Sequence, residues 1–554
     1  MSDTTWLGVA SFALTFTMFA TPPALLLAWW WTDRKQTQHA VLRAFPLLGR
    51  IRYLLEHVGP ELRQYLFDGD LAGRPFSRAD FLSVVFASKY MNTLISFGSK
   101  RDFDAPGWYL RNALFPTLAG DLALDQRAAL PTRRYVIEHE GILHRAEQQR
   151  DATVAPWTLR DEHALQIGAG LARPWIVRGQ VGVSGMSYGA LGSHAIRAMA
   201  EGVALATGGW INTGEGGLSE HHLAGGGDVI FQIGPGCFGV RDDAGAWSWE
   251  RLREKAALES VRGFELKLHQ GAKIRGGHLE GSKVTPEIAA MRGVPAWKSV
   301  DSPNRFPFLD GVDALLDHVA RMREVAGKPV GVKVVMGGPG AADELAAAMA
   351  RRGDGPDWIT VDGGEGGSGA TYQEMADSVG LPVRSGIVLL DDALRAHGVR
   401  ERVRVIASGK LFSADRAALA LAFGADLIHV ARAFMIAVGC IQAQKCHTNQ
   451  CPAGVATTDP KRMSALVVEE KRYRAMNFLI TMRAGLASLA AAAGLASPTQ
   501  FERKHAVYRD ALGRVIGADA LFPYPEPGEA GSVHAARAAA DALRAQAARE
   551  RRSA

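Results

Sequence analysis

Three of the four cysteines in the chain, Cys440, Cys446 and Cys451, lie in the stretch CIQAQKCHTNQCPAG with the spacing C-x5-C-x4-C. A structural zinc site is disfavoured because closely spaced cysteine pairs are absent, although His447 is nearby. A disulfide would leave one thiol over. Thiolates also hold iron–sulfur clusters, and Pro452 follows the last cysteine as in ferredoxin-type runs, although the spacing differs from the common ferredoxin patterns. The pattern therefore favours an iron–sulfur cluster.

A second candidate group is the stretch KLHQGAK, which contains Lys267, Gln270 and Lys273 at spacings of three. The stretch ends a predicted strand, so these side chains are expected around the mouth of a sheet or barrel. Buried lysines need an anionic or electron-rich partner. A flavin ring that gains negative charge on reduction and a carboxylate substrate are suitable partners. The alternative is two solvated lysines on a loop.

Glycine-rich turns follow three of the predicted strands. GGEGGSGA occupies residues 363–370, SGKL residues 408–411 and ARAF residues 431–434. Backbone N–H groups in such turns, together with helix N-termini, can bind an anion. Gly409, Lys410 and Arg432 are therefore candidates to hold a phosphate, and the three turns together indicate a phosphorylated cofactor. A tight turn alone is the alternative explanation for each of them.

The elements that position these residues begin near residue 170, where short β-branched runs alternate with alanine-rich helical stretches. This alternation is typical of βα units with a parallel sheet. The runs occupy residues 175–185, 208–214, 229–234, 263–271, 329–335, 357–364, 403–409 and 425–431. Eight units predict an α/β fold with a closed (β/α)8 TIM barrel, whose active site lies at the C-terminal ends of the strands. A doubly wound open sheet is the alternative.

The N-terminal segment has a different composition, because no charged residue occurs from Trp6 to Trp31. This length can cross a hydrocarbon core about 30 Å thick, with tryptophans at both interfaces. A cleaved signal peptide is the alternative, but no basic n-region precedes the apolar run. The basic flank after Asp33 predicts a single-pass anchor in the inner (cytoplasmic) membrane, with the catalytic domain in the cytoplasm.

The composition divides the chain into four expected segments and excludes some functions. The segments are an anchor (1–31), a juxtamembrane helical region (32–165), the barrel with its cysteine loop (166–465) and a C-terminal helical extension (466–554). The formal net charge is only +6 and no long basic run is interleaved with aromatics, so nucleic acid is not an expected partner. Clustered cysteines do not suit a secreted disulfide framework.

Several motifs together resemble the FMN-binding synthase domain of glutamate synthases, from about residue 170 to 465. They are GMSYGALG (185–192), NTGEGG (212–217), FGV (238–240), KLHQGAK (267–273), G-G-x-L-x-G-x-K-V (276–284), GGSGA (366–370) and CIQAQKCHTNQCPAGVATTDP (440–460). The resemblance implies a (β/α)8 barrel that binds FMN. It also implies a [3Fe–4S] cluster held by Cys440, Cys446 and Cys451.

The family's roles carry over to matching positions. The resemblance implies flavin contacts at Met186, Ser187, Tyr188, Gln232, Lys267, Lys333, Ser368 and Gly369, and a phosphate region at Gly409, Lys410 and Arg432. It implies that Gln270, Lys273 and Arg292 hold 2-oxoglutarate, with Glu215 at the ammonia entry. Lys273 and Arg292 can pair with two carboxylates, and reduced FMN can supply hydride to an imine carbon.

The chain departs from the family at three places. It begins MSDTTW, where the mature family enzyme begins with the cysteine nucleophile of a glutaminase domain. Ammonia is then expected from solution or from an amidotransferase subunit. The stretch DSPNRFPF (301–308) replaces a proline- and histidine-rich substrate wall. Cys237 replaces a flavin-facing arginine and is expected to be buried and inert.

These features predict an FMN- and iron–sulfur-dependent oxidoreductase that reductively aminates 2-oxoglutarate or a related oxo acid. No nicotinamide-binding fingerprint follows a strand, so electrons are expected from an external donor, either ferredoxin-like or a reductase subunit. One alternative keeps both cofactors and changes the substrate. Another is a membrane-tethered electron-transfer subunit without turnover of its own.

Overall fold

The computed structural model describes residues 3–141, 145–271 and 276–528, and the chain divides into two compact units, Met1–Asp80 and Phe81–Ala554. The first unit contains the helices α1 (Asp3–Lys35), α2 (Ala40–Ala44) and α3 (Leu48–Leu62) and the π-helical turn η1 (Arg63–Phe67). Within it, Arg50 forms an ion pair with Asp33 at 2.6 Å. This pair ties α3 to the end of α1.

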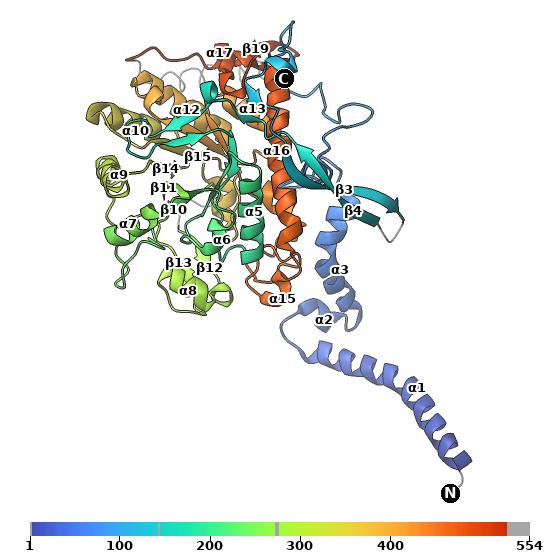
Figure 1. The fold of residues 1–554 in the computed structure, drawn as a ribbon. Coiled ribbons are helices and arrows are strands. Elements are labelled where there is room, and N and C mark those ends of the chain that lie inside the picture. Colours follow the sequence, from blue (N-terminus) through green and yellow to red (C-terminus); the bar gives the residue numbers. More distant parts are fainter. Residues whose placement is uncertain (1–2, 142–144, 272–275, 529–554) are drawn as a thin grey trace, which may run out of the picture. The chain divides into compact units, whose positions relative to one another are not determined.

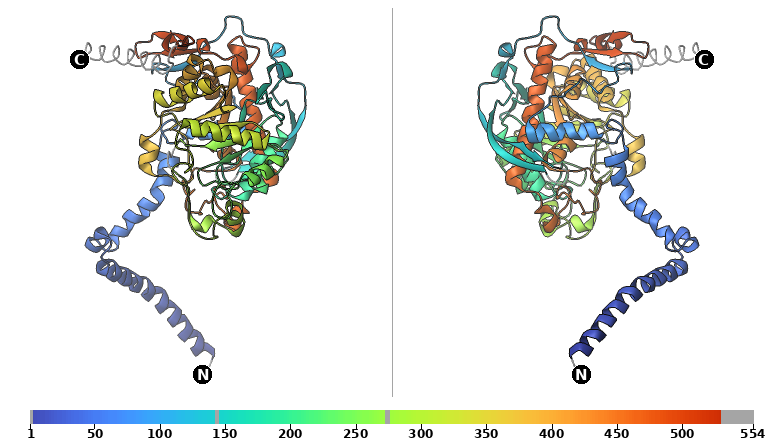
Figure 2. Two further views of the ribbon diagram at one scale, coloured as in Figure 1. Left: turned by 90° about the vertical axis from the view of Figure 1, so that its left-hand side faces the viewer. Right: turned by 90° about the vertical axis from the view of Figure 1, so that its right-hand side faces the viewer.

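The second unit contains a closed barrel of eight parallel strands, shown in Figures 1 and 2. In their order around the barrel, the strands are β8 (Val181–Val183), β9 (Trp210–Asn212), β10 (Asp228–Ile233), β11 (Val261–Lys267), β14 (Val330–Val334), β15 (Trp358–Asp362), β16 (Arg404–Ser408) and β17 (Leu427–Val430). Each overlaps one of the eight predicted runs, although β10 and β11 begin one and two residues before theirs. The (β/α)8 prediction is confirmed, and the pairing of β17 with β8 excludes the open sheet.

Helices connect the strands and cover the outside of the barrel. They are α5 (Ser193–Leu205), α6 (Glu220–Leu223), α7 (Trp249–Ala257), α8 (Pro286–Arg292), α9 (Val312–Ala326), α10 (Pro339–Arg352), α11 (Gln373–Ser378), α12 (Val383–Ala396), α13 (Ala414–Ala422) and α14 (Arg432–Val438). Most are amphipathic and turn an apolar face toward the strands, as expected for the outer ring of this fold.

Large aromatic side chains fill the N-terminal end of the barrel. Trp210 and Trp358 begin β9 and β15, are fully buried and pack in one cluster with Trp175 of strand β7 (Trp175–Val177). Glycines leave room for them, because a Cβ at Gly182 would come within 2.2 Å of Trp210 and one at Gly331 within 2.1 Å of Trp358. This end is therefore closed, and a ligand must enter from the opposite end.

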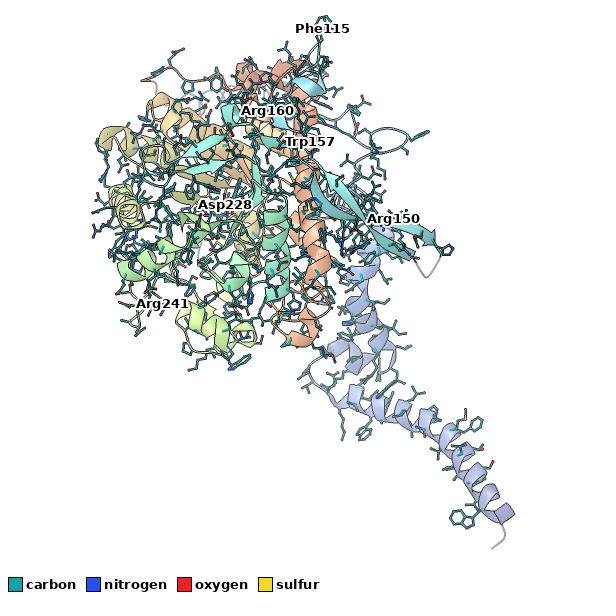
Figure 3. The ribbon with its side chains drawn as sticks, in the orientation of Figure 1. Phe115, Arg150, Trp157, Arg160, Asp228 and Arg241 are labelled. Carbon is teal, nitrogen blue, oxygen red and sulfur yellow. The ribbon has the colours of Figure 1, made fainter. Side chains whose placement is uncertain are left out.

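The expectation of a helical region over 32–165 is wrong for its second half. After α4 (Arg78–Tyr90), the chain forms the strands β1 (Gly107–Leu110), β2 (Leu124–Asp125), β3 (Leu130–Glu140), β4 (Arg145–Val154), β5 (Thr158–Leu159) and β6 (Leu165–Ile167). β3 and β4 pair as a long antiparallel hairpin, in which Arg150, labelled in Figure 3, lies opposite Arg134. Charged residues dominate this hairpin, so an apolar strand signal is absent from its sequence.

The C-terminal segment is only partly helical. It begins with α15 (Pro460–Met463) and α16 (Val468–Ala492), and α16 packs along α5. The strands β18 (Ala506–Arg509) and β19 (Val515–Gly517) and the short helix α17 (Ala518–Leu521) follow. β18 pairs with β1, which lies far away in the sequence. Over the described residues, up to 528, the expected helical extension is therefore corrected to a helix followed by strands of a small antiparallel sheet, and the expected final helix or tail lies outside them.

Two helices in the described part of the chain are long and apolar enough to cross a membrane, Val9–Lys35 within α1 and Val468–Ala492. For the second, 61% of the apolar window is buried. Its Arg483 is buried and donates to the backbone carbonyls of Pro156, Ala206 and Thr207. This helix is therefore a core element, and only α1 remains a candidate anchor.

A buried ion cluster fastens the C-terminal segment to the barrel. Arg503 is fully buried and donates to Asp391 at 2.9 Å and to Asp392 at 2.5 Å, both on α12. Arg400 donates to the other oxygen of Asp391 at 2.7 Å. Because burial of an unpaired charge is costly, these residues depend on one another.

We expect Arg503→Met to lower the free energy of unfolding by about 3–5 kcal/mol, because the buried carboxylates of Asp391 and Asp392 would each lose one cationic partner. Denaturant unfolding followed by tryptophan fluorescence measures the change. Arg514→Met is the control, because Arg514 is half exposed in its ion pair with Asp510 and should contribute no more than about 1 kcal/mol. Equal effects of the two substitutions would contradict the role of the buried cluster.

Candidate active site at the mouth of the barrel

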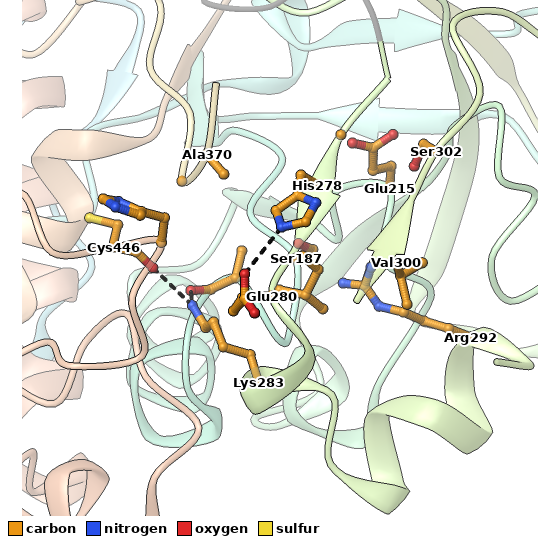
Figure 4. A pocket seen from close by; sticks show the side chains of 15 residues that line it. Ser187, Glu215, His278, Glu280, Lys283, Arg292, Val300, Ser302, Ala370 and Cys446 are labelled. Carbon is orange, nitrogen blue, oxygen red and sulfur yellow. Dashed lines mark hydrogen bonds and ion pairs between the residues drawn. The ribbon is translucent and has the colours of Figure 1, made fainter. Parts of the chain in front are cut away.

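The predicted site residues on the barrel lie at or beyond the C-terminal ends of its strands. A pocket opens there, and five of these residues line it: Ser187, Glu215, Arg292, Gly369 and Cys446. In Figure 4, Glu215 and Arg292 lie on one side of this pocket and Cys446 on the other. Segments separated by more than 200 positions therefore contribute to one cavity.

Lys267 at the end of β11 is buried rather than solvated. Its Nζ donates to Glu215 Oε1 at 2.6 Å and to Gln270 Oε1 at 2.8 Å. Gln270 in turn donates through Nε2 to the carbonyl of Gly367 at 2.8 Å. The loops after β9, β11 and β15 are therefore joined by one hydrogen-bonded chain. Lys273 lies in 272–275, outside the described residues.

Lys333 on β14 is the register neighbour of Lys267 on β11. It is also buried, and its Nζ lies 3.2 Å from Asp362 Oδ2 at the end of β15. Burial alone would raise the pKa of Asp362, but the charge of Lys333 and hydrogen bonds from Ser408 and Gly271 outweigh it and lower that pKa. Each of the two adjacent ammonium groups therefore has its own carboxylate partner.

Glu265, which the sequence analysis did not select, organises the barrel interior beneath these lysines. It is fully buried and accepts hydrogen bonds from Asn212 at 2.8 Å and from Gln232 at 2.7 Å. Its other oxygen accepts from Trp358 and Thr360. The amide of Gln232 is therefore held at a fixed orientation. The available signal was a glutamate in the apolar run GFELKL, where a charge needs partners.

The turn after β8 carries Met186, Ser187 and Tyr188. The Met186 carbonyl accepts from His222 Nε2 at 3.2 Å, and the Tyr188 hydroxyl donates to Glu287 at 2.6 Å. Burial and the neighbouring carboxylate raise the pKa of Tyr188, so its hydroxyl remains protonated. The turn is thus fixed at both ends, while Ser187 faces the pocket.

Arg292, the last residue of α8, is buried against the pocket. Its Nη2 donates to the Tyr188 carbonyl at 3.1 Å, its guanidinium lies 5.2 Å from the ring centre of Phe238, and Nε has no partner among the described residues. Burial lowers its pKa to about 10, against the opposing effect of Glu215. The group is therefore charged at neutral pH and can still accept a carboxylate.

The residues predicted for a phosphate lie where two glycine-rich turns meet. Gly409 has φ +145°, and a Cβ there would lie 3.2 Å from the backbone nitrogen of Gly363. Arg432 at the start of α14 donates to the Glu365 carbonyl at 2.5 Å, and a Cβ at Gly367 would meet its side chain. Ser368 donates to the Ala370 carbonyl, and Lys410 has φ +52°. Close backbone approach, rather than turn formation alone, accounts for these glycines.

The three clustered cysteines share one loop after α14, and Cys446 reaches the pocket. Burial raises the pKa of Cys440 to about 12, and negative charge on Cys446 and Cys451 acts in the same direction. Thiolates here therefore require a positive centre.

The distances between the three cysteine sulfurs can be compared with those expected for a single zinc ion. Sulfur ligands of one tetrahedral zinc lie about 3.8 Å apart. Among the described residues, Glu220, His221 and Glu287 form the group with ligand atoms within 4.8 Å of one another, and the cysteines do not. At least two of the three cysteine sulfurs therefore lie more than 4.8 Å apart in this structure.

Cys237 lies apart from this loop. It is buried, and burial raises the pKa of its thiol to about 11. It therefore stays protonated at neutral pH, and its burial agrees with the expectation.

The pocket is also lined by residues that the sequence motifs did not identify. His278 on β12 (His278–Leu279) lies 2.8 Å from Asp301 on β13 (Val300–Asp301) and 3.4 Å from Glu280. The hydrogen bond to Asp301 raises the pKa of His278, against a smaller opposing effect of burial. The stretch that departs from the family thus reaches the pocket through Ser302, and its Asp301 contacts the pocket-lining His278.

Comparison with known proteins agrees with this geometry. A family model described as the conserved region in glutamate synthase matches residues 139–496. The glutamate synthase large subunit-like protein YerD of Bacillus subtilis is 47% identical over 502 residues, which cover 90% of this chain and 96% of that protein.

More distant relatives match a smaller share of this chain. The archaeal-type glutamate synthase [NADPH] of Thermotoga neapolitana is 33% identical over 297 residues, but the match covers only 55% of its length. A glutamate synthase large subunit-like protein of Rhizobium meliloti is 31% identical over 331 residues, which cover 56% of this chain and 71% of that protein. From the family match and the near full-length likeness to YerD, we conclude that this chain belongs to the glutamate synthase family of oxidoreductases.

Proposed function

We propose that this protein is an FMN- and iron–sulfur-dependent enzyme of the glutamate synthase type, which reductively aminates 2-oxoglutarate or a related 2-oxo acid. One observation carries the proposal: three groups line a single pocket. They are Arg292, whose Nε has no hydrogen-bond partner among the described residues, the Glu215 carboxylate paired with Lys267, and Cys446 of the thiol loop. An electron relay without turnover has no use for a carboxylate-binding arginine.

The residues at the mouth suit FMN and a cluster. The glycine turns around Gly363, Gly367 and Gly409 with Arg432 fit a phosphate, and Gln232 and Lys267 present donors where an isoalloxazine ring would gain negative charge. Cys440, Cys446 and Cys451 fit a [3Fe–4S] cluster. When bound, FMN supplies the hydride and the cluster supplies single electrons.

The chain's own residues account for binding and proton transfer. The Arg292 guanidinium and Gln270 bind and orient the oxo acid, and Lys273 is expected to assist them. The Glu215 carboxylate, paired with Lys267 at 2.6 Å, is the group that would accept a proton from incoming ammonium. Ammonia comes from solution or from a separate amidotransferase subunit, and electrons come from a ferredoxin-like protein or a reductase subunit.

A different 2-oxo acid is the second candidate substrate, and the pocket wall favours it. His278, Glu280 and Ser302 line the pocket on the side where DSPNRFPF departs from the family. Asp301 lies 2.8 Å from His278 there, and this hydrogen bond raises the pKa of the imidazole. A substrate whose far end hydrogen-bonds to this pair suits the site as well as a second carboxylate does.

Anaerobic titration of the photoreduced protein with 2-oxoglutarate and ammonium should reoxidise the flavin, followed by its absorbance, and should form glutamate. Reoxidation by another oxo acid alone would select the second substrate. If none of a panel of 2-oxo acids reoxidises the flavin, the protein is an electron-transfer subunit and the proposal fails.

In the same titration, Arg292→Met should weaken oxo-acid binding roughly 10- to 100-fold, because it removes a charged hydrogen bond of about 1.5–3 kcal/mol. Arg241→Met is the matched control, because Arg241 lies against the same Phe238 ring at 5.9 Å but does not line the pocket. A similar loss in both variants would show that Arg292 acts through packing.

Cys446→Ser should abolish the iron signal in electron paramagnetic resonance and lower the iron content, because a serine hydroxyl is a poor ligand for the cluster. Cys237→Ala should retain both, since Cys237 stands apart from the thiol loop. Full iron content in Cys446→Ser would refute the ligand assignment.

Deletion of residues 1–31 should move the protein from the membrane to the soluble fraction, because it removes the apolar helix Val9–Lys35 almost entirely. Fractionation and immunoblotting measure the change. If the shortened protein stays on the membrane, anchoring belongs to the amphipathic residues 46–67 instead.

A further inference from the structure

Lys283 is a buried lysine to which neither the sequence motifs nor the proposed chemistry assigns a role, although it is the lysine of the G-G-x-L-x-G-x-K-V motif. It ends the short 3-10 turn η4 (Gly281–Lys283) and is 2% exposed. Its Nζ donates to the carbonyls of Ala190 at 2.6 Å, Cys446 at 3.1 Å and Ala456 at 3.2 Å. One ammonium group therefore joins the turn after β8, the thiol loop and the segment that follows that loop. Figure 4 shows its bond to Cys446.

The three acceptors of Lys283 are neutral, although the group is charged and buried. All three N–H bonds of an ammonium are used by these carbonyls. Burial of a charge without an opposite charge is costly. Burial lowers the pKa of Lys283, and negative charge on the sulfurs of Cys446 and Cys451 would oppose that effect. The position of this lysine is therefore best explained by negative charge on the thiol loop.

A second contact fixes the same two segments to each other. Asn449, between Cys446 and Cys451, donates through Nδ2 to the Ser282 carbonyl at 3.0 Å. Its Oδ1 accepts from the Thr458 backbone nitrogen at 2.8 Å, and Thr457 donates to its carbonyl. The thiol loop is thus attached to residues 282 and 283 at two neighbouring points. Lys283 supplies the charged one.

We propose that Lys283 is a positioning residue that holds the thiol loop against the turn after β8 and raises the reduction potential of the bound cluster. This inference rests on the proposed function. Reduction of a cluster adds one electron and breaks no bond, so the reduced form carries one more negative charge. A buried cation stabilises that form more than the oxidised one, and its removal must lower the potential.

The test compares Lys283→Gln, which loses the charge, with Lys283→Arg, which keeps it. Lys328→Gln is the matched control. Lys328 is also buried and donates to two carbonyls, those of Leu258 and Val261, but it lies at the N-terminal ends of β11 and β14. The readouts are iron per chain, flavin per chain and the cluster's midpoint potential from a dithionite titration monitored by electron paramagnetic resonance.

We expect Lys283→Gln to retain flavin and to show a lower cluster potential or a loss of iron. Lys283→Arg should recover most of the potential, and Lys328→Gln should match the unmodified protein. Unchanged iron and potential in Lys283→Gln would overturn the inference. Equal changes in Lys328→Gln, or unfolding of both Lys283 variants, would make Lys283 an ordinary structural lysine and would overturn it as well.

If the unmodified protein carries no iron, the cluster in the proposed function fails and with it the effect on potential. The positioning role is then decided by hydrogen exchange of amides 440–458 in the iron-free protein. Faster exchange in Lys283→Gln than in Lys328→Gln supports positioning, and equal exchange rejects it.

Discussion

Two ammonium groups placed side by side at the ends of β11 and β14 impose the main electrostatic constraint on this molecule. Lys267 and Lys333 are register neighbours and both are buried, so each would be unstable without an opposite charge. Glu215 and Asp362 provide these charges from the ends of β9 and β15. The loops of four strands must therefore adopt one mutual arrangement before the mouth of the barrel is stable.

The N-terminal end of the barrel is closed, so the charged groups are accessible to ligands only from the opposite end. Trp210, Trp358 and Trp175 fill that end, and Gly182 and Gly331 are needed to accommodate the indoles. Above them lies Glu265 with its four donors, and above Glu265 lie the lysine pairs. The interior thus changes from apolar to polar to charged along the axis, and ligands meet only the charged end.

The sequence predicted the barrel well because its strands are short apolar runs whose signal is local. The Glu215–Lys267 ion pair was harder to predict. Both residues were identified from the sequence, but their contact depends on strand register. Glu265 and Lys283 were missed because each is one charged residue within a motif, and only burial reveals its partners. The strands between residues 107 and 167 were missed because charged side chains mask β3 and β4, and β1 pairs with a strand near the other end of the chain.

That last pairing has a consequence for biosynthesis. Arg509 donates to the Asp104 carbonyl at 2.7 Å across 405 positions, and β1 has its partner only once β18 exists. Translation proceeds at about 5–20 residues per second, so β1 remains without its partner strand for roughly 20 seconds or longer after it leaves the ribosome. An unpaired strand edge invites association with other chains. Nascent chains of this protein thus have an interval in which a chaperone is most useful.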